Sequence, residues 1–137
     1  MRRVLEIRVR YGETDTSGVV YHGDYFQYFE IGRTELMRSL GVPYREMEES
    51  GVFLSVVDAA ARYLRPAHYD DRLRIETTLT EVGGARVSFR YEIYRGETDE
   101  LLCTGTTRLG ALDAETRRAC RLPSQVRELL AAAEGCD

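Results

Sequence analysis

The feature that most constrains this chain is one long helical pattern followed by extended segments almost to the C-terminus. From Asp24 to Leu40, apolar residues recur at spacings of three and four, which is the period of an amphipathic helix. The apolar positions are Phe26, Phe29, Leu36, Met37 and Leu40. A helix of this extent is about 25 Å long. It can therefore cross the whole of a 137-residue domain.

Extended segments make up most of the remaining chain. Four follow the helix, at residues 52–65, 72–82, 86–95 and 101–112, and one precedes it at residues 4–11. In the earliest segment the residues that alternate with charged ones are Leu5, Ile7, Val9 and Tyr11. This period of two predicts a strand with one buried side. Gly83-Gly84 predicts a hairpin between two of the later strands.

Two shorter helical segments complete the pattern. Pro43 opens a helical turn that ends at Ser50, and Pro123-Ser124 opens a terminal helix. There is no internal repeat or low-complexity linker, so residues 1–137 are expected to form a single domain. The order of elements predicts an α+β fold in which one antiparallel sheet covers one long helix. Such a sheet leaves two edges and one face uncovered, so we expect a homo-oligomer, with a dimer as the minimal unit and a tetramer as the fuller assembly.

The composition argues against several classes of function. A net charge of −4 disfavours a nucleic-acid-binding surface, because phosphate binding needs an excess of cationic side chains. The 3 cysteines, Cys103, Cys120 and Cys136, include no C-x-x-C pair, so neither a disulfide framework nor a metal site is indicated, and no cofactor is expected. Cys103 alternates with Leu101 and is predicted to lie in the core. No apolar run is long enough for a signal peptide or for a membrane-spanning helix. We therefore expect no signal peptide, no membrane insertion and a cytoplasmic protein.

The long connection from Gly12 to Gly23 is the first candidate for chemistry. It carries Asp15 and His22 just before the start of the long helix. Free backbone N–H groups at a helix start, together with the positive end of the helix dipole, stabilise negative charge on an oxygen. A carboxylate folded back beside them would be a nucleophile or base facing an oxyanion hole, the arrangement that acyl transfer requires.

Two sets of motifs carry a family resemblance. The first is the loop sequence GETDTSGVVYHGDY at residues 12–25, followed by Arg33-Thr34-Glu35. The second is YLRPA at residues 63–67 with DDRL at residues 70–73. Together they resemble the hotdog-fold acyl-CoA thioesterases of the 4-hydroxybenzoyl-CoA thioesterase group, and most nearly its bacterial Tol–Pal-associated branch. The resemblance covers roughly residues 5–125 and implies a five-stranded antiparallel sheet wrapped around the central helix, with a C-terminal helix added.

The resemblance also assigns roles to individual residues. It places the catalytic carboxylate on Asp15, which either attacks the thioester carbonyl or activates water. It aligns the N–H group that polarises the carbonyl with His22, with Gly23 beside it. An Asp with an ordinary pKa is ionised at neutral pH and is a weak base, so we expect direct attack or a strongly positioned water. Three tyrosines are expected either to contact the acyl group or to fill the core: Tyr21, Tyr25 and Tyr63.

The same residues have simpler interpretations. Asp15 lies between two threonines and can form an Asx turn, and His22 can be a partly buried loop residue. Glu13 either sets the pKa of Asp15 or, as we expect, faces solvent or forms a salt bridge.

The arginines have both structural and binding interpretations. Arg33 interrupts the apolar stripe of the helix and is expected to be buried beside Glu30 or Asp58. The phosphates of coenzyme A suit arginine, and the candidates for that contact are Arg62, Arg65, Arg86 and Arg90.

Three functions are therefore open. The leading one is hydrolysis of an acyl-CoA thioester, with an acyl carrier protein thioester as the alternative substrate, at a site shared between two subunits. A non-catalytic acyl-thioester-binding protein is the second, and the presence of Asp15 argues against it. A hotdog 3-hydroxyacyl-thioester dehydratase is the third, and its His-x4-Gly pattern is missing because Gln27 stands five residues after His22.

Overall fold

The computed structural model describes residues 1–42 and 44–134. In chain order the elements are β1 (Arg2–Arg8), the 3-10 helix η1 (Tyr11–Glu13), α1 (Asp24–Ser39), α2 (Tyr44–Glu49), β2 (Val52–Tyr63), β3 (Arg72–Val82), β4 (Arg86–Arg95), β5 (Leu101–Asp113) and α3 (Ser124–Ala133). These elements follow the predicted order. Pro43, where the short helix was expected to open, lies outside the described residues.

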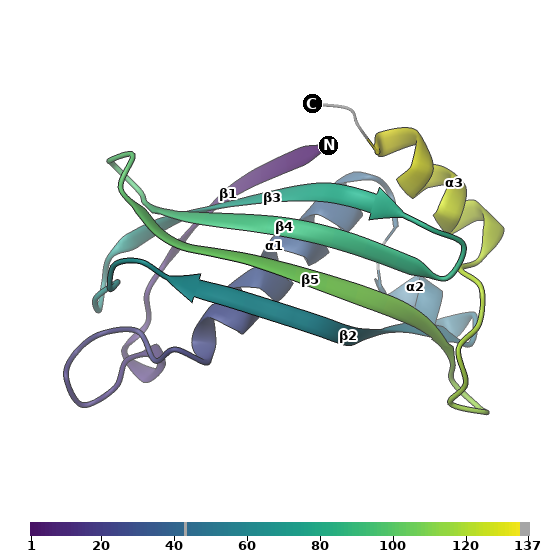
Figure 1. The fold of residues 1–137 in the computed structure, drawn as a ribbon, viewed down its shortest axis with the longest axis horizontal. Coiled ribbons are helices and arrows are strands. Elements are labelled where there is room, and N and C mark those ends of the chain that lie inside the picture. The colour runs from purple at the N-terminus through teal and green to yellow at the C-terminus, as the bar shows by residue number, and fades with distance from the viewer. Residues whose placement is uncertain (43, 135–137) are drawn as a thin grey trace.

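The strands form one antiparallel five-stranded sheet in the order β1-β3-β4-β5-β2. Helix α1 crosses one face of this sheet, and α3 lies near one end of it (Figure 1). Among the residues that the structure describes, no helix covers the other face. The predicted α+β hotdog fold is confirmed, with β1 and β2 as the two edge strands.

Close packing between α1 and the sheet forms the core. Phe29 is fully buried and stacks on Tyr91 of β4, with ring centroids 4.4 Å apart. A Cβ at Gly105 of β5 would lie 2.3 Å from the Phe29 ring, so this glycine lets the helix approach the sheet. The buried face of α1 also includes Leu36 and Met37, as the apolar spacing predicts. Cys103 is buried as expected, and burial raises the pKa of its thiol to about 12.

Two predicted core positions are wrong. Phe26 is 38% exposed, because the buried face of α1 is occupied by Tyr25, Tyr28 and Phe29. Tyr11 is 79% exposed. Strand β1 ends at Arg8, and Tyr11 instead begins η1.

Arg33 is buried in the middle of α1, as predicted, with only 7% of its surface exposed. Its Nη2 lies 3.9 Å from Oε2 of Glu30, and it hydrogen-bonds the hydroxyl of Tyr91. The alternative partner was wrong, because Asp58 pairs with Arg108 at 2.9 Å. Arg33 therefore lies between α1 and β4, and its buried position agrees with the structural role that was expected. Within the described residues, no helix is long and apolar enough to cross a membrane.

Candidate active site

The loop between η1 and α1 folds as a tight turn that starts at Asp15. Thr14 and Val20 form an antiparallel bridge, and the N–H of Asp15 donates to the carbonyl of Val19 at 2.8 Å. Gly18 has a φ of 84°, a conformation that favours glycine, and its N–H donates to the carbonyl of Asp15 at 3.0 Å. These backbone hydrogen bonds fix the position of the Asp15 backbone, from which the carboxylate extends.

The carboxylate of Asp15 is exposed and held by Ser17. Its Oδ1 accepts hydrogen bonds from the hydroxyl of Ser17 at 2.6 Å and from the N–H of Ser17 at 2.8 Å. These bonds, the hydroxyl bond first, lower the pKa of Asp15, and the nearby charge of His22 lowers it further. Asp15 is therefore ionised at neutral pH. It also forms the Asx turn that the simpler interpretation predicted.

The start of α1 presents backbone donors. The N–H of Asp24 donates to the carbonyl of Tyr21 at 2.9 Å, and that of Phe26 donates to the carbonyl of Gly23 at 3.3 Å. Among the described residues, no acceptor contacts the N–H groups of His22 and Gly23. The helix therefore begins with free donors where an oxyanion could be bound.

Tyr63 fixes the peptide at this helix start. Its hydroxyl donates to the carbonyl of His22 at 2.8 Å. In a trans peptide the carbonyl and the following N–H point in opposite directions, so this bond also fixes the N–H of Gly23. The ring of Tyr21 packs over Gly23, where a Cβ would lie only 2.9 Å from Cε2 of that ring.

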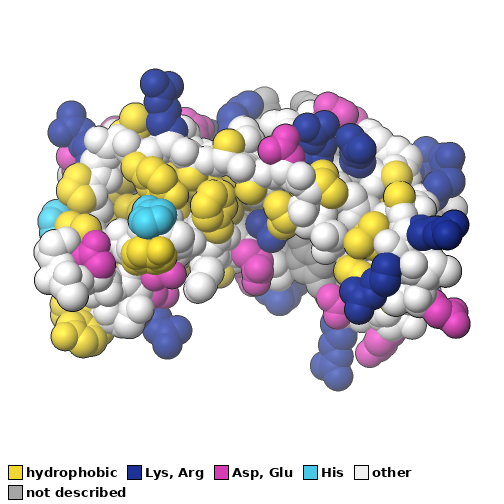
Figure 2. All heavy atoms as spheres, turned by 60° about the horizontal axis from the view of Figure 1, so that its bottom comes forward, with side chains coloured by type: hydrophobic (Ala, Val, Ile, Leu, Met, Phe, Trp, Pro, Cys, Tyr) yellow, Lys and Arg dark blue, Asp and Glu magenta, His cyan; other side chains and the backbone are white. Residues whose placement is uncertain are grey.

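A cleft of about 260 Å³ opens beside these donors. It is lined by Val20, His22, Tyr25, Tyr63, Leu64, Arg65 and Pro66. The rings of Tyr25 and Tyr63 meet edge to face at 5.2 Å, and the rings of Tyr21 and His22 lie 4.3 Å apart. Burial raises the pKa of Tyr25 to about 12, so its phenol remains protonated. Figure 2 shows one face of the molecule, on which hydrophobic side chains surround a surface histidine.

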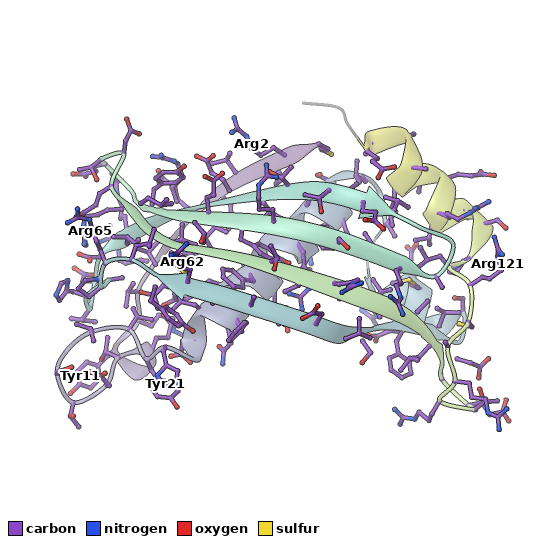
Figure 3. The ribbon with its side chains drawn as sticks, in the orientation of Figure 1. Arg2, Tyr11, Tyr21, Arg62, Arg65 and Arg121 are labelled. Atoms are coloured by element: carbon purple, nitrogen blue, oxygen red, sulfur yellow. The ribbon has the colours of Figure 1, made fainter. Side chains whose placement is uncertain are left out.

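The structure brings together many of the predicted site residues. His22, Tyr25, Tyr63 and Arg65 line the cleft, and Tyr21 packs on His22. Asp15 is absent from the cleft lining itself and lies on the adjoining turn, close enough for the charge of His22 to lower its pKa. Tyr11, Tyr21, Arg62 and Arg65 lie at the same end of the sheet, and Arg121 lies at the opposite end (Figure 3).

The predicted phosphate contacts are divided between separate places. Arg62 and Arg90 line a second depression of about 260 Å³ together with Thr104 and Thr106. Arg65 lies 3.7 Å from Glu100 in an ion pair. Arg86 is not brought to either depression, because it pairs with Gly110 about 13 Å along β4 from Arg90.

Several contacts at the site were missed or wrongly predicted. Glu13 neither faces solvent freely nor forms a salt bridge, because its Oε1 accepts from the hydroxyl of Tyr28 at 3.0 Å and from the N–H of Arg10 at 2.8 Å. Sequence reasoning also missed Ser17, although an Asx turn at Asp15 places the backbone N–H two residues on, that of Ser17, against the carboxylate.

One wall of the cleft is held by a distant arginine. Arg95 of β4 donates to the carbonyl of Pro66 at 2.9 Å and pairs with both Asp71 and Glu100. No local sequence signal marks this contact, because Arg95 is far from Pro66 in the chain. No group of three or more His, Cys, Asp or Glu in the described part of the chain could hold a metal ion.

Comparison with known proteins identifies the family. The chain belongs to the thioesterase-like superfamily, whose model matches residues 9–130. It is 33% identical over 122 residues to the acyl-CoA thioesterase YbgC of Haemophilus influenzae, covering 88% of both chains. It is 42% identical over 89 residues to YneP of Bacillus subtilis, a match that spans 65% of this chain and 64% of that relative.

A solved structure agrees with this assignment. The DHNA-CoA thioesterase from Staphylococcus aureus superimposes with a TM-score of 0.88 at 30% sequence identity, covering 96% of this chain and 92% of that chain. The resemblance stated from the loop motifs is thus confirmed.

Proposed function

We propose that this chain is an acyl-CoA thioesterase that hydrolyses a thioester to a free acid and a thiol. The observation that carries the proposal is the ionised carboxylate of Asp15 on the turn that leads into the start of α1, where the N–H groups of His22 and Gly23 are free. The adjoining cleft gives the acyl thioester a place to bind. The named relative YbgC supports the acyl-CoA substrate.

The reaction follows from the placement of these groups. The N–H of Gly23, or that of His22, polarises the thioester carbonyl and stabilises the negative oxygen that forms. Asp15 either attacks the carbonyl carbon, giving an anhydride that water then opens, or takes a proton from the water that attacks. In both routes one water is consumed, the C–S bond breaks, and the sulfur leaves as a thiolate that takes up a proton.

The test is thiol release from a panel of aliphatic and aromatic acyl-CoAs. Steady turnover of at least one member supports hydrolysis, and binding without thiol release from any member supports the non-catalytic binder instead. Formation of an enoyl product from a 3-hydroxyacyl-CoA would support the dehydratase. Acyl carrier protein thioesters belong in the same panel, because the cleft is open and the pantetheine arm is common to both carriers.

We also propose that Arg62 and Arg90 bind the phosphates of coenzyme A. Among the described residues neither guanidinium has an ion-pair partner, and the hydroxyls of Thr104 and Thr106 line the same depression. Arg65 lies at the rim of the catalytic cleft, although Glu100 partly neutralises it. This arrangement supplies two cations and two hydroxyls outside the reacting centre.

Replacing both arginines, R62A with R90A, is expected to raise KM for acyl-CoA about tenfold and to leave kcat nearly unchanged, because uniform binding is lost. The measurement is steady-state kinetics with acyl-CoA and with the matching acyl-pantetheine, which has no nucleotide phosphates. R86A is the matched control on β4. An equal rise in KM for acyl-pantetheine would contradict a phosphate contact.

We propose further that two copies pair along the edge strand β2. The exposed β2 edge carries Val56 and Val57, which are 46% and 55% exposed, and Tyr63 at its end lines the cleft. The opposite edge strand, β1, carries arginines and glutamate that oppose edge pairing. A dimer through β2 would place the cleft near the subunit boundary, and two such dimers could form the tetramer. The free thiols of Cys103 and Cys120 suit a reducing compartment and support a cytoplasmic location.

V56E is expected to shift the protein from dimer or tetramer toward monomer, because a charge then replaces apolar surface at the proposed contact. Light scattering at several protein concentrations measures the change. V4E is the matched control, since Val4 is 43% exposed on the other edge strand. Pairing through β2 would be contradicted if the molar mass of V56E in solution were unchanged, or if V4E lowered that mass as much as V56E.

A further inference from the structure

The two oxygens of the Asp15 carboxylate have different environments. Oδ1 accepts both hydrogen bonds from Ser17, at 2.6 Å from the hydroxyl and 2.8 Å from the N–H. Neither hydrogen bond from Ser17 ends on Oδ2, and the backbone N–H of Val19 also lowers the pKa of this carboxylate. A carboxylate bound through one oxygen keeps its plane fixed while the other oxygen stays available.

Ser17 is itself held on both sides of the turn. The N–H of Gly18 donates to the carbonyl of Asp15 at 3.0 Å, and the carbonyl of Gly18 accepts from the N–H of Tyr69 at 3.4 Å. Val19 forms a bridge with His68 of the neighbouring segment. The serine hydroxyl therefore extends from a backbone that is tied to a second segment of the chain.

We propose that Ser17 is a positioning residue that holds Oδ1 of Asp15 and presents Oδ2 as the oxygen that acts on the thioester or on water. This inference rests on the proposed thioesterase function and names a division of labour within its carboxylate. The hydroxyl limits rotation about the Cβ–Cγ bond of Asp15. Without it, the carboxylate keeps only backbone N–H donors, those of Ser17 and Val19, and samples orientations in which neither oxygen faces the carbonyl.

The charged groups around Asp15 define what else acts on it. The imidazole of His22 is the neighbouring titratable group whose charge lowers the pKa of Asp15. His68 lies across the bridge from Val19, and its Nδ1 lies 3.7 Å from Oδ2 of Asp71. The hydroxyl of Ser17 is the largest influence on the Asp15 carboxylate, ahead of both its own N–H and His22.

The test compares S17A with S17T, which keeps the hydroxyl, and with T16A as the matched control on the same turn. S17A is expected to lower kcat about tenfold with KM changed less than twofold, because substrate binding is untouched while the reacting oxygen loses its orientation. The acidic limb of the kcat profile should move to higher pH in S17A, since a hydrogen bond that favours the charged form is lost. S17T should restore both kcat and the position of the acidic limb. T16A should have the kcat and the pH profile of the unmodified protein.

An NMR titration of the Asp15 carboxyl carbon gives a readout that does not depend on turnover. S17A should raise the titration midpoint, and S17T should return it. An unchanged midpoint and unchanged kcat in S17A, with thermal melting as the check on folding, would overturn the inference. Absence of turnover in the unmodified protein would overturn the proposed function. If the titration midpoint of Asp15 still shifts in S17A, the contact between Ser17 and Asp15 is present and only the proposed function is wrong.

Discussion

D15N is expected to abolish thiol release, with a loss in kcat of about 10³-fold or more. The amide oxygen can still accept the two hydrogen bonds from Ser17, so the turn should persist. The amide can neither attack a carbonyl as an anion nor take a proton from water. The measurement is steady-state thiol release with the acyl-CoA that the unmodified protein turns over best.

The matched control for this variant is D113N. Asp113 is also a turn-forming acid, half-buried at the end of β5, whose Oδ1 accepts from the N–H groups of Glu115 and Thr116 at 2.9 Å. Hydrogen bonds lower its pKa just as they lower that of Asp15. D113N should therefore keep full activity. Turnover of D15N within tenfold of the unmodified protein would contradict the catalytic role of Asp15.

G105A is expected to destabilise the protein by about 2–3 kcal/mol, the effect of overfilling a well-packed core. The added Cβ would lie 2.3 Å from the Phe29 ring and 2.9 Å from the carbonyl of Ala60. The Phe29 ring is completely buried and stacks on the ring of Tyr91. It therefore cannot move away from the added Cβ unless α1 is displaced. Thermal unfolding at fixed protein concentration should show a midpoint roughly 5–10 °C lower.

G110A on the same strand is the matched control. Within the described part of the chain, a Cβ at Gly110 would have a single neighbour within 4 Å, Cγ1 of Val57 at 3.4 Å, which is near ordinary contact distance. The melting temperature of G110A should therefore be close to that of the unmodified protein. Equal melting temperatures for G105A and G110A would mean that α1 can move away from the sheet at little cost in free energy, contrary to the packing described.

The elements of the fold could be predicted because each has a local signal. The spacing of apolar residues in α1 and the alternation in β3 and β4 reflect burial on one side of each element. The burial of Phe26 was predicted wrongly because Tyr25 and Tyr28 share the buried face, and tyrosines were not counted as apolar in the pattern. The helix phase was thus read from too few residues.

The site could be predicted only in part. The loop motif pointed to Asp15 and His22, and both lie at the start of α1 or on the adjoining turn. The distribution of arginines could not be predicted, because it depends on which strands are neighbours. Arg62 and Arg90 meet across β5 only in the observed strand order, and the same register carries Arg86 away from them.

The packed rings beneath the cleft have a consequence for substrate length. Tyr25 forms part of the cleft, and Tyr28, Phe29 and Tyr91 behind it are each at most 1% exposed, so the described interior leaves no channel for a long hydrocarbon tail. Such a tail would extend over the surface outside the cleft. Selectivity for chain length could then diverge through surface replacements alone, while the interior that supports the helix stays constant.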